Sequence, residues 1–231
     1  MSVTMQKKAM QEDTKPAVIS RRDGSFDVGV ASIYGRVCAD DLSVVNRVVQ
    51  EFGLPGIRLS AARTMVVEGV PNDLADRVQQ ALGSACASVQ YMISGCPGND
   101  VCKRGALSTA SMAQRLEKVL EDLGTMPAPV KCGLSGCPRC CGESVVRDVG
   151  LMGTGKKGWT VFFGGNAGRK IRAGDEVGRG LNDEQTIALA SRLLAVYRAK
   201  ARPRERTARF VERVGIAMIK RVVMRGPEHD D

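Results

Sequence analysis

Residues 134–144 read LSGCPRCCGES and place three cysteines within five positions, between two glycines and beside a proline. A second stretch, ISGCPGNDVCKRG at 93–105, has the same order: an apolar segment, Ser-Gly-Cys-Pro, a further cysteine and a glycine. Cys96 and Cys102 are spaced C-x5-C, whereas Cys137 and Cys141 are spaced C-x3-C. Two matched turns of this kind indicate that their thiols serve one site.

The composition is that of a soluble globular chain. It has 231 residues, 43% hydrophobic and 26% charged, which is enough for one large domain or two small ones. No apolar run approaches the roughly 18 residues of a membrane span. The N-terminus, MSVTMQKKAMQEDTK, lacks the apolar segment of a secretory signal. The sequence therefore predicts a cytoplasmic protein with no membrane association.

Three kinds of site compete for the clustered cysteines. Structural zinc usually uses C-x2–4-C pairs; Cys137 and Cys140 fit that spacing, but the C-x5-C pair fits poorly. Disulfides are disfavoured in a reducing compartment. Four thiolates around an iron–sulfur cluster agree best with the pattern. If residues 137–141 form a helical turn, Cys137 and Cys141 share a face and Cys140 points away, so Cys140 is left out of the predicted ligand set.

The net charge and the single histidine indicate which partners and metals the chain can bind. The net charge of +9 suits nucleic acid, yet aromatic residues make up only 4% and do not interleave with basic runs. An anionic cofactor or an acidic electron-carrier protein fits better, so we expect no nucleic-acid partner. The only histidine, His229, lies in the tail, which argues against a His-based metal site. Cys38 and Cys86 stand alone among apolar residues and are predicted to be small core residues.

The pattern of apolar residues predicts an α+β fold in two parts. Residues 1–24 are polar and are predicted to form a flexible arm. Residues 25–87 combine predicted strands at 26–37 and 56–70 with predicted helices at 39–53 and 71–83. Residues 88–231 form the second part, with predicted strands at 88–95, 127–136, 144–153 and 158–166, and predicted helices at 101–124, 182–201 and 203–223.

On these residues, the chain resembles the siroheme-containing sulfite and nitrite reductases. GCPGNDVC and GLSGCPRCC carry the resemblance most specifically. IRLSAARTMVVEGVP at 57–71 resembles the strand of the family's ferredoxin-like half-domain that contacts siroheme. Residues 148–172 resemble the strands and GGN loop that follow the second cysteine pair. RTARFVERVG at 206–215 resembles the tail of the large subunit of bacterial siroheme nitrite reductases. The resemblance covers roughly residues 25–220.

The resemblance implies a ferredoxin-like half-domain followed by a domain that binds a 4Fe–4S cluster and siroheme. The implied cluster ligands are Cys96, Cys102, Cys137 and Cys141, and Cys141 is also the axial ligand of the siroheme iron. Siroheme carries carboxylates, so cationic and polar residues are expected around it: Arg58, Ser60, Arg63, Thr64, Lys103, Arg104, Asn166, Arg169, Lys170 and Arg172. Among these, Arg58, Arg63 and Lys103 are expected to bind the substrate oxyanion and help to protonate it.

The chain departs from the large enzymes of this family in having room for only one copy of the repeated unit, and so resembles the small single-unit sulfite reductases. Ala62 stands where the large enzymes' first copy has an arginine, with Arg63 one position along. A homodimer is one way to replace the missing copy. No flavin or nicotinamide fingerprint is present, so electrons are expected from an external carrier such as a ferredoxin.

The leading prediction is six-electron reduction of sulfite to sulfide, with nitrite reduction to ammonia as the alternative that RTARFVERVG favours. Two other classes stay open at this point. One is an iron–sulfur electron-transfer protein without siroheme, and the other is a zinc-stabilised nucleic-acid-binding module.

Overall fold

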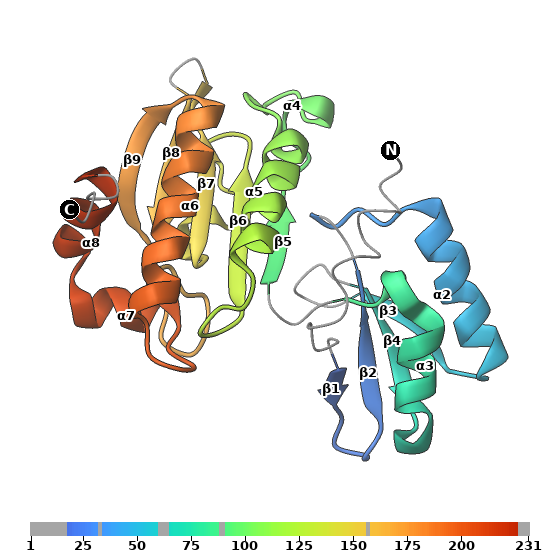
Figure 1. Cartoon of the computed structure of the whole chain (residues 1–231). Coiled ribbons are helices and arrows are strands. Elements are labelled where there is room, and N and C mark those ends of the chain that lie inside the picture. The colour runs from blue at the N-terminus through green and yellow to red at the C-terminus, as the bar shows by residue number, and fades with distance from the viewer. Residues whose placement is uncertain (1–17, 32–33, 60–64, 88–90, 156–157, 226–231) are drawn as a thin grey trace. The chain divides into compact units, whose positions relative to one another are not determined.

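The computed structural model describes residues 18–31, 34–59, 65–87, 91–155 and 158–225, and it divides the chain into two units, Met1–Gln90 and Tyr91–Asp231. The first unit contains an antiparallel sheet in the order β1-β2-β4-β3. Two helices accompany this sheet (Figure 1). Its elements are β1 Val18–Ser20, β2 Phe26–Val30, α2 Ala39–Glu51, β3 Gly56–Leu59, β4 Met65–Val70, η1 Asn72–Leu74, α3 Ala75–Leu82 and η2 Gly83–Ala85.

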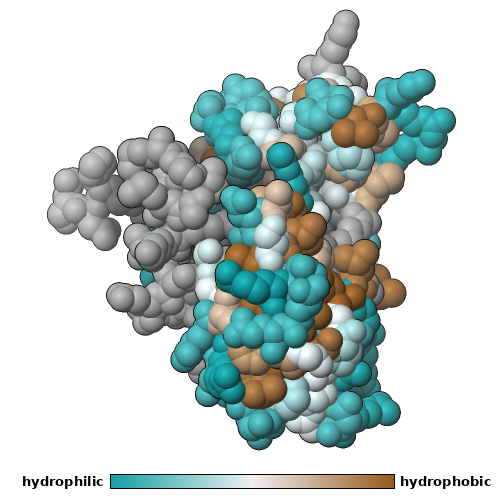
Figure 2. Space-filling view, turned by 90° about the vertical axis from the view of Figure 1, so that its right-hand side faces the viewer, coloured by the Kyte–Doolittle hydropathy of each residue, from teal (hydrophilic) through white to brown (hydrophobic). Residues whose placement is uncertain are grey.

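Alternation along the strands produces the core of the first unit. Val28 and Val30 of β2 are fully buried and belong to one cluster with Val45 of α2 and Val78 of α3. Burial of these branched side chains stabilises the sheet and helices together. Figure 2 shows that apolar residues also lie among hydrophilic ones on the surface it presents.

Two predictions for this unit are corrected. The single strand predicted at 56–70 is two strands, since Gly56–Leu59 and Met65–Val70 pair antiparallel, with Gly56 opposite Glu68 and Leu59 opposite Met65; residues 60–64 lie outside the described residues. Both halves of the segment are apolar, so the pattern alone did not reveal the reversal. Val18–Ser20, predicted to lie in the flexible arm, form β1 and pair with β2; residues 1–17 of that arm lie outside the described residues.

The second unit contains a mixed sheet in the order β5-β6-β7-β8-β9. Strands β5, β6 and β7 are parallel, whereas β8 and β9 run antiparallel to their neighbours. Helices α5 and α6 lie side by side along the sheet (Figure 1). Its elements are β5 Tyr91–Gly95, α4 Gly98–Val101, α5 Thr109–Leu123, β6 Val130–Ser135, η3 Ser144–Val146, β7 Val149–Gly153, β8 Trp159–Phe163, β9 Asp175–Leu181, α6 Asp183–Lys200, α7 Thr207–Val214 and α8 Ile216–Arg225.

The predicted helices of this unit are broken where caps or glycines intervene. The helix predicted at 101–124 begins at Thr109, since the Ser108 side chain caps it by accepting from the Ser111 N–H. The helix predicted at 203–223 is two helices, α7 and α8, separated at Gly215, whose φ is 85°. Strand β9 was not predicted, because its sequence DEVGRGL is charged and rich in glycine.

The described helices include none with the length and apolar run needed to cross a membrane.

Candidate iron–sulfur site

Both cysteine turns lie at the same edge of the second unit's sheet. Strands β5 and β6 are parallel neighbours with Gly95 opposite Leu134, and each leads directly into its Gly-Cys-Pro sequence. The Cys96 N–H donates to the Leu134 carbonyl at 3.0 Å. The Gly136 N–H donates to Cys96 Sγ at 3.2 Å. The carboxyl edge of the parallel strands thus brings the two turns together, as this edge does for ligand sites in open α/β sheets.

Glycine makes this close approach feasible. A Cβ on Gly136 would lie 2.8 Å from Gly98 Cα and 2.8 Å from the Leu107 carbonyl oxygen. Real Cβ atoms do not approach other atoms so closely, so the backbones of the two turns abut only because both residues lack side chains. Any larger residue at position 136 would push the two turns apart.

The start of α5 ties the two turns together. Thr109 Oγ1 donates to the Cys96 carbonyl at 2.5 Å. The Ala106 and Leu107 N–H groups both donate to the Gly136 carbonyl, at 2.8 and 3.2 Å. The loop that carries Cys102 is therefore fixed at both ends against the second turn.

The second turn is not helical, which corrects one prediction. The Cys140 N–H donates to the Cys137 carbonyl at 3.3 Å, and Cys140 then takes a left-handed conformation with φ of 57°. A left-handed residue ends any helical path, so the expected shared helical face of Cys137 and Cys141 does not form. Cys140 Sγ lies 3.2 Å from the hydroxyl of Ser144.

The chemistry of the donor set fits an iron–sulfur cluster. No disulfide joins the cysteines of the described residues; Cys96, Cys102 and Cys137 are partly buried, and Cys141 is exposed. Among the described residues, no group of three or more Cys, His, Asp or Glu is placed to hold a single metal ion. A 4Fe–4S cluster takes one thiolate at each iron, and the two turns supply four thiols, Cys96, Cys102, Cys137 and Cys141, beside Cys140.

Three cysteines, Cys38, Cys86 and Cys132, lie outside the two turns. Cys38 is exposed, not buried as predicted, and its Sγ accepts from the Asp41 N–H at 3.4 Å at the start of α2. Cys86 packs beside the core of the first unit as predicted, and burial raises its pKa to about 11. Cys132, in β6, is fully buried.

In the loop between β8 and β9, the predicted cofactor contacts Asn166 and Arg172 form hydrogen bonds that stabilise the loop. The Asn166 side chain donates to the Lys170 carbonyl at 2.6 Å. Arg172 donates to the Gly164 carbonyl at 2.8 Å and forms an ion pair with Asp175 at 2.6 Å. Arg169 is exposed. Lys170 pairs with Glu212. Among the described residues, Arg169 is therefore the predicted cation of this loop that has no ion pair with an acid.

Arg58 belongs to an ionic network in the first unit. It forms ion pairs with Asp27 and, at 3.3 Å, with Glu68. Burial by itself would raise the pKa of Asp27, but hydrogen bonds from Arg21, the Gly69 N–H and Arg58 outweigh it and lower that pKa. Half of the Arg58 side chain stays exposed. The other predicted residues of this segment, Ser60, Arg63 and Thr64, lie outside the described residues.

Exposed cations border the cysteine turns. Lys103 and Arg104 follow Cys102 and are exposed, and no ion pair among the described residues includes them. Sequence reasoning missed Arg139, an exposed cation inside the second turn, and it also missed the buried serines Ser135 and Ser144. The repeated Ser-Gly-Cys-Pro was a signal for the first of these serines.

The comparisons with known proteins agree with this geometry. Residues 88–229 match the nitrite and sulphite reductase 4Fe-4S domain, and residues 19–85 match the nitrite/sulfite reductase ferredoxin-like half domain. The chain is 32% identical over 220 residues to the assimilatory-type sulfite reductase of Nitratidesulfovibrio vulgaris, covering 93% of this chain and 100% of that protein.

Nitrite reductases are also similar, over part of their length. The nitrite reductase [NAD(P)H] of Bacillus subtilis is 31% identical over 88% of this chain but only 26% of its own. Among solved structures, the Mycobacterium tuberculosis NirA protein has a TM-score of 0.70 at 24% identity, covering 89% of this chain and 41% of that one. Dissimilatory sulfite reductase I has a TM-score of 0.71 at 12% identity, covering 86% of this chain and 69% of that one. These two structures support the fold.

The chain belongs to the nitrite and sulphite reductase family of oxidoreductases. This result confirms the predicted α+β class with its ferredoxin-like half-domain, and it confirms the predicted cofactors, a 4Fe–4S cluster and siroheme.

Proposed function

We propose that the protein reduces sulfite to sulfide in a six-electron reaction. The observation that carries this choice is the match over the whole length of an assimilatory-type sulfite reductase, whereas the nitrite reductase of B. subtilis is matched over about a quarter of its length. Nitrite reduction to ammonia is the alternative, since similarity to that enzyme is nearly as high along this chain.

The proposed cluster ligands are Cys96, Cys102, Cys137 and Cys141, and Cys141 is the proposed bridge to siroheme. When bound, the coupled cofactors supply electrons singly to an anion on the iron. The protein's own part is to hold the two turns together through Gly98 and Gly136 and to fix the thiols at one edge of the sheet. Such fixed positions lower the reorganisation that each electron transfer requires.

The proposed residues for the anionic groups are the exposed cations. Lys103, Arg104 and Arg169 have charges that no described acid neutralises, so they suit the siroheme carboxylates and, at Lys103, the oxyanion. We retain Arg58 and Arg63 as proposed oxyanion contacts. To bind the oxyanion, Arg58 must give up its ion pair with Asp27. Ser60, Thr64, Asn166 and Arg172 stay predicted cofactor contacts. The side chains of Asn166 and Arg172 already donate hydrogen bonds to carbonyl groups of their loop, and these bonds compete with contacts to the cofactor.

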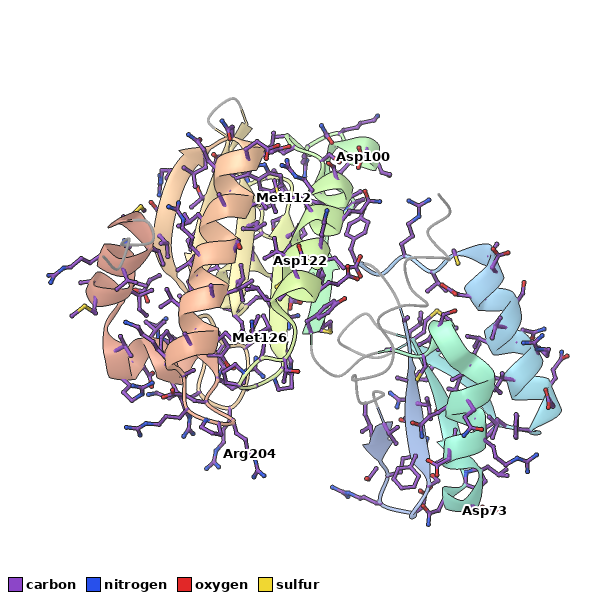
Figure 3. The ribbon with its side chains drawn as sticks, viewed as in Figure 1. Asp73, Asp100, Met112, Asp122, Met126 and Arg204 are labelled. Carbon is purple, nitrogen blue, oxygen red and sulfur yellow. The ribbon has the colours of Figure 1, made fainter. Side chains whose placement is uncertain are left out.

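We also propose that electrons come from an acidic carrier protein that docks at the loop carrying Cys102. Val101 is 77% exposed in this loop, next to a proposed cluster ligand and close to Lys103 and Arg104. Asp100, labelled in Figure 3, accepts from Ser108 at 3.0 Å beside the start of α5. The loop therefore offers an exposed apolar residue with Asp100 before it and the cations Lys103 and Arg104 just after it, and these cations suit electrostatic docking of an acidic partner.

The proposed domain boundaries are 1–24, 25–87 and 88–231, with the cluster and siroheme assigned mainly to the last. The proposed compartment is the cytoplasm, in keeping with free cysteines.

Product analysis tests the proposed function. The protein, purified anaerobically from cells that make siroheme, is reduced with a small chemical reductant and given sulfite or nitrite. We expect sulfide from sulfite at a higher kcat/KM than ammonia from nitrite. The reverse ranking would make it a nitrite reductase, and no turnover of either by protein containing siroheme would contradict the proposal.

A further inference from the structure

Cys140, the cysteine left out of the ligand set, lies in a hydrogen-bonded chain beneath the second turn. Its Sγ is 3.2 Å from Ser144 Oγ, and the Ser144 hydroxyl donates to Ser135 Oγ at 3.0 Å. Ser135 Oγ also accepts from the Gly142 N–H at 3.0 Å. The Gly142 bond closes the segment 135–142 into a loop, and both serines at its base are fully buried.

The direction of these bonds follows from the number of protons. A serine hydroxyl has one proton, and Ser144 gives its proton to Ser135. The Cys140 S–H is then the donor to Ser144 Oγ, so its sulfur faces the loop base.

The backbone gives a second, independent reason for this bond. Cys140 has a φ of 57°, a left-handed conformation that is uncommon in non-glycine residues. Glycine would adopt it without strain, yet the chain has cysteine here. The side chain must therefore supply something that glycine lacks, and its hydrogen bond to Ser144 is the contact that the structure offers.

We propose that Cys140 is a positioning residue: its thiol braces the ligand turn against Ser144 and Ser135 and so fixes the directions of Cys137 and Cys141. The proposal rests on the proposed cluster ligation by Cys96, Cys102, Cys137 and Cys141. It gives Cys140 a role in retaining the cluster without a bond to iron.

The rate of cluster loss tests this role without measuring enzyme activity. Anaerobically purified, cluster-loaded protein is mixed with an iron chelator, and the decay of visible absorbance is followed alongside iron and sulfide content. Loss of one net hydrogen bond predicts about a 2- to 10-fold faster decay for Cys140→Ala. Ser144→Ala removes this bond and the bond to Ser135 as well, so it should decay at least as fast. The double variant should decay no faster than Ser144→Ala, because the Cys140 bond is already lost in that variant.

Two further variants separate the thiol from the backbone. Cys140→Ser retains a donor and should decay nearly as slowly as the natural protein. Cys140→Gly relieves the left-handed strain but removes the donor, so it should decay as fast as Cys140→Ala. Cys86→Ala, at a partly buried cysteine of the first unit, serves as the control and should leave the rate unchanged.

Distinct outcomes would overturn the brace and the ligand assignment. Unchanged decay in Cys140→Ala, slow decay in Cys140→Gly, or additive effects in the double variant would show that the thiol does not brace the turn. Loss of iron from Cys140→Ser at purification would make Cys140 a ligand. A full cluster retained in Cys137→Ser or Cys141→Ser would instead refute the proposed ligand set on which the inference rests. If Ser144→Ala yields no folded protein, the three Cys140 variants alone still decide the result.

Discussion

At the scale of single residues, Gly136 shows how the site depends on the absence of a side chain. Its carbonyl accepts two N–H groups from the other turn, and a Cβ would lie 2.8 Å from backbone atoms of Gly98 and Leu107. Backbone atoms cannot move aside as a flexible side chain can. The close packing of the two turns therefore requires glycine at position 136.

We expect Gly136→Ala to destabilise the protein by about 1–3 kcal/mol, the usual cost of overpacking, and to lower its iron content. Urea unfolding and iron analysis measure both effects. Gly168→Ala is the control. A Cβ at Gly168, in an exposed loop, would lie 3.2 Å from the nearest atom, which belongs to the Asn166 side chain and not to the backbone. Equal stability of the two variants would show that the turns are not packed as described.

Cys141→Ser should lose both the cluster and siroheme signals, because one thiolate is proposed to serve both. The visible spectrum and iron content check this, with Cys38→Ser as an exposed control outside the proposed ligand set. A Cys141→Ser protein with a complete siroheme spectrum would contradict the proposed bridge.

At the scale of elements, the loop before α7 depends on one carboxylate. Glu205 accepts from Arg213 at 2.8 and 2.7 Å and from the Arg202 N–H at 2.9 Å. The Arg213 hydrogen bonds, aided by the Arg202 N–H, lower the pKa of Glu205 to about 2. A carboxylate with a lowered pKa in the folded state stabilises the fold above its ordinary pKa, and that contribution is lost as the pH falls toward 2.

Glu205→Gln should therefore lower the Tm at pH 7, and the difference from the natural protein should shrink as the pH falls from about 5 to about 3. Thermal unfolding followed by circular dichroism across this range measures it. A Tm difference that stays constant over the range would show that the charge of Glu205 contributes nothing.

The loop carrying Cys102 gives the test of carrier docking. Val101→Asp should raise the KM for a reduced plant-type [2Fe–2S] ferredoxin several-fold and leave turnover with a small chemical reductant unchanged, because the Val101 side chain is exposed on the proposed docking surface. Ile171→Asp is a matched control: Ile171 is 78% exposed and its basic neighbours Lys170 and Arg172 are already paired with acids. Equal effects of both variants on the ferredoxin KM would contradict docking at this loop.

The elements also show what sequence reasoning could and could not predict. The strands leading to Cys96 and Cys137 were predicted because apolar runs end at Gly-Cys-Pro. The helical turn at 137–141 was wrong, because residue spacing says nothing of a left-handed cysteine. The buried serine pair Ser135–Ser144 depends on the chain folding back along β6, a tertiary effect that no local pattern records.

At the scale of the whole molecule, two units with separate sheets and cores make up the chain, and both match domains of one family. The class was predicted from the two cysteine pairs, whereas the boundary near residue 88, inferred from a change of pattern, stays a prediction. The pattern could not show which cations keep free charge: Arg58 and Arg172 are engaged by acids, whereas Lys103 and Arg104 are not paired with described ones.

We propose that the two cysteine turns hold a cluster coupled to siroheme, and the visible absorption spectrum of the anaerobically purified protein is the first measurement to make. We expect a siroheme spectrum together with iron and acid-labile sulfide, and a shift of the reduced spectrum when sulfite is added. A featureless iron–sulfur absorbance from cells known to make siroheme, with no response to sulfite or nitrite, would contradict it.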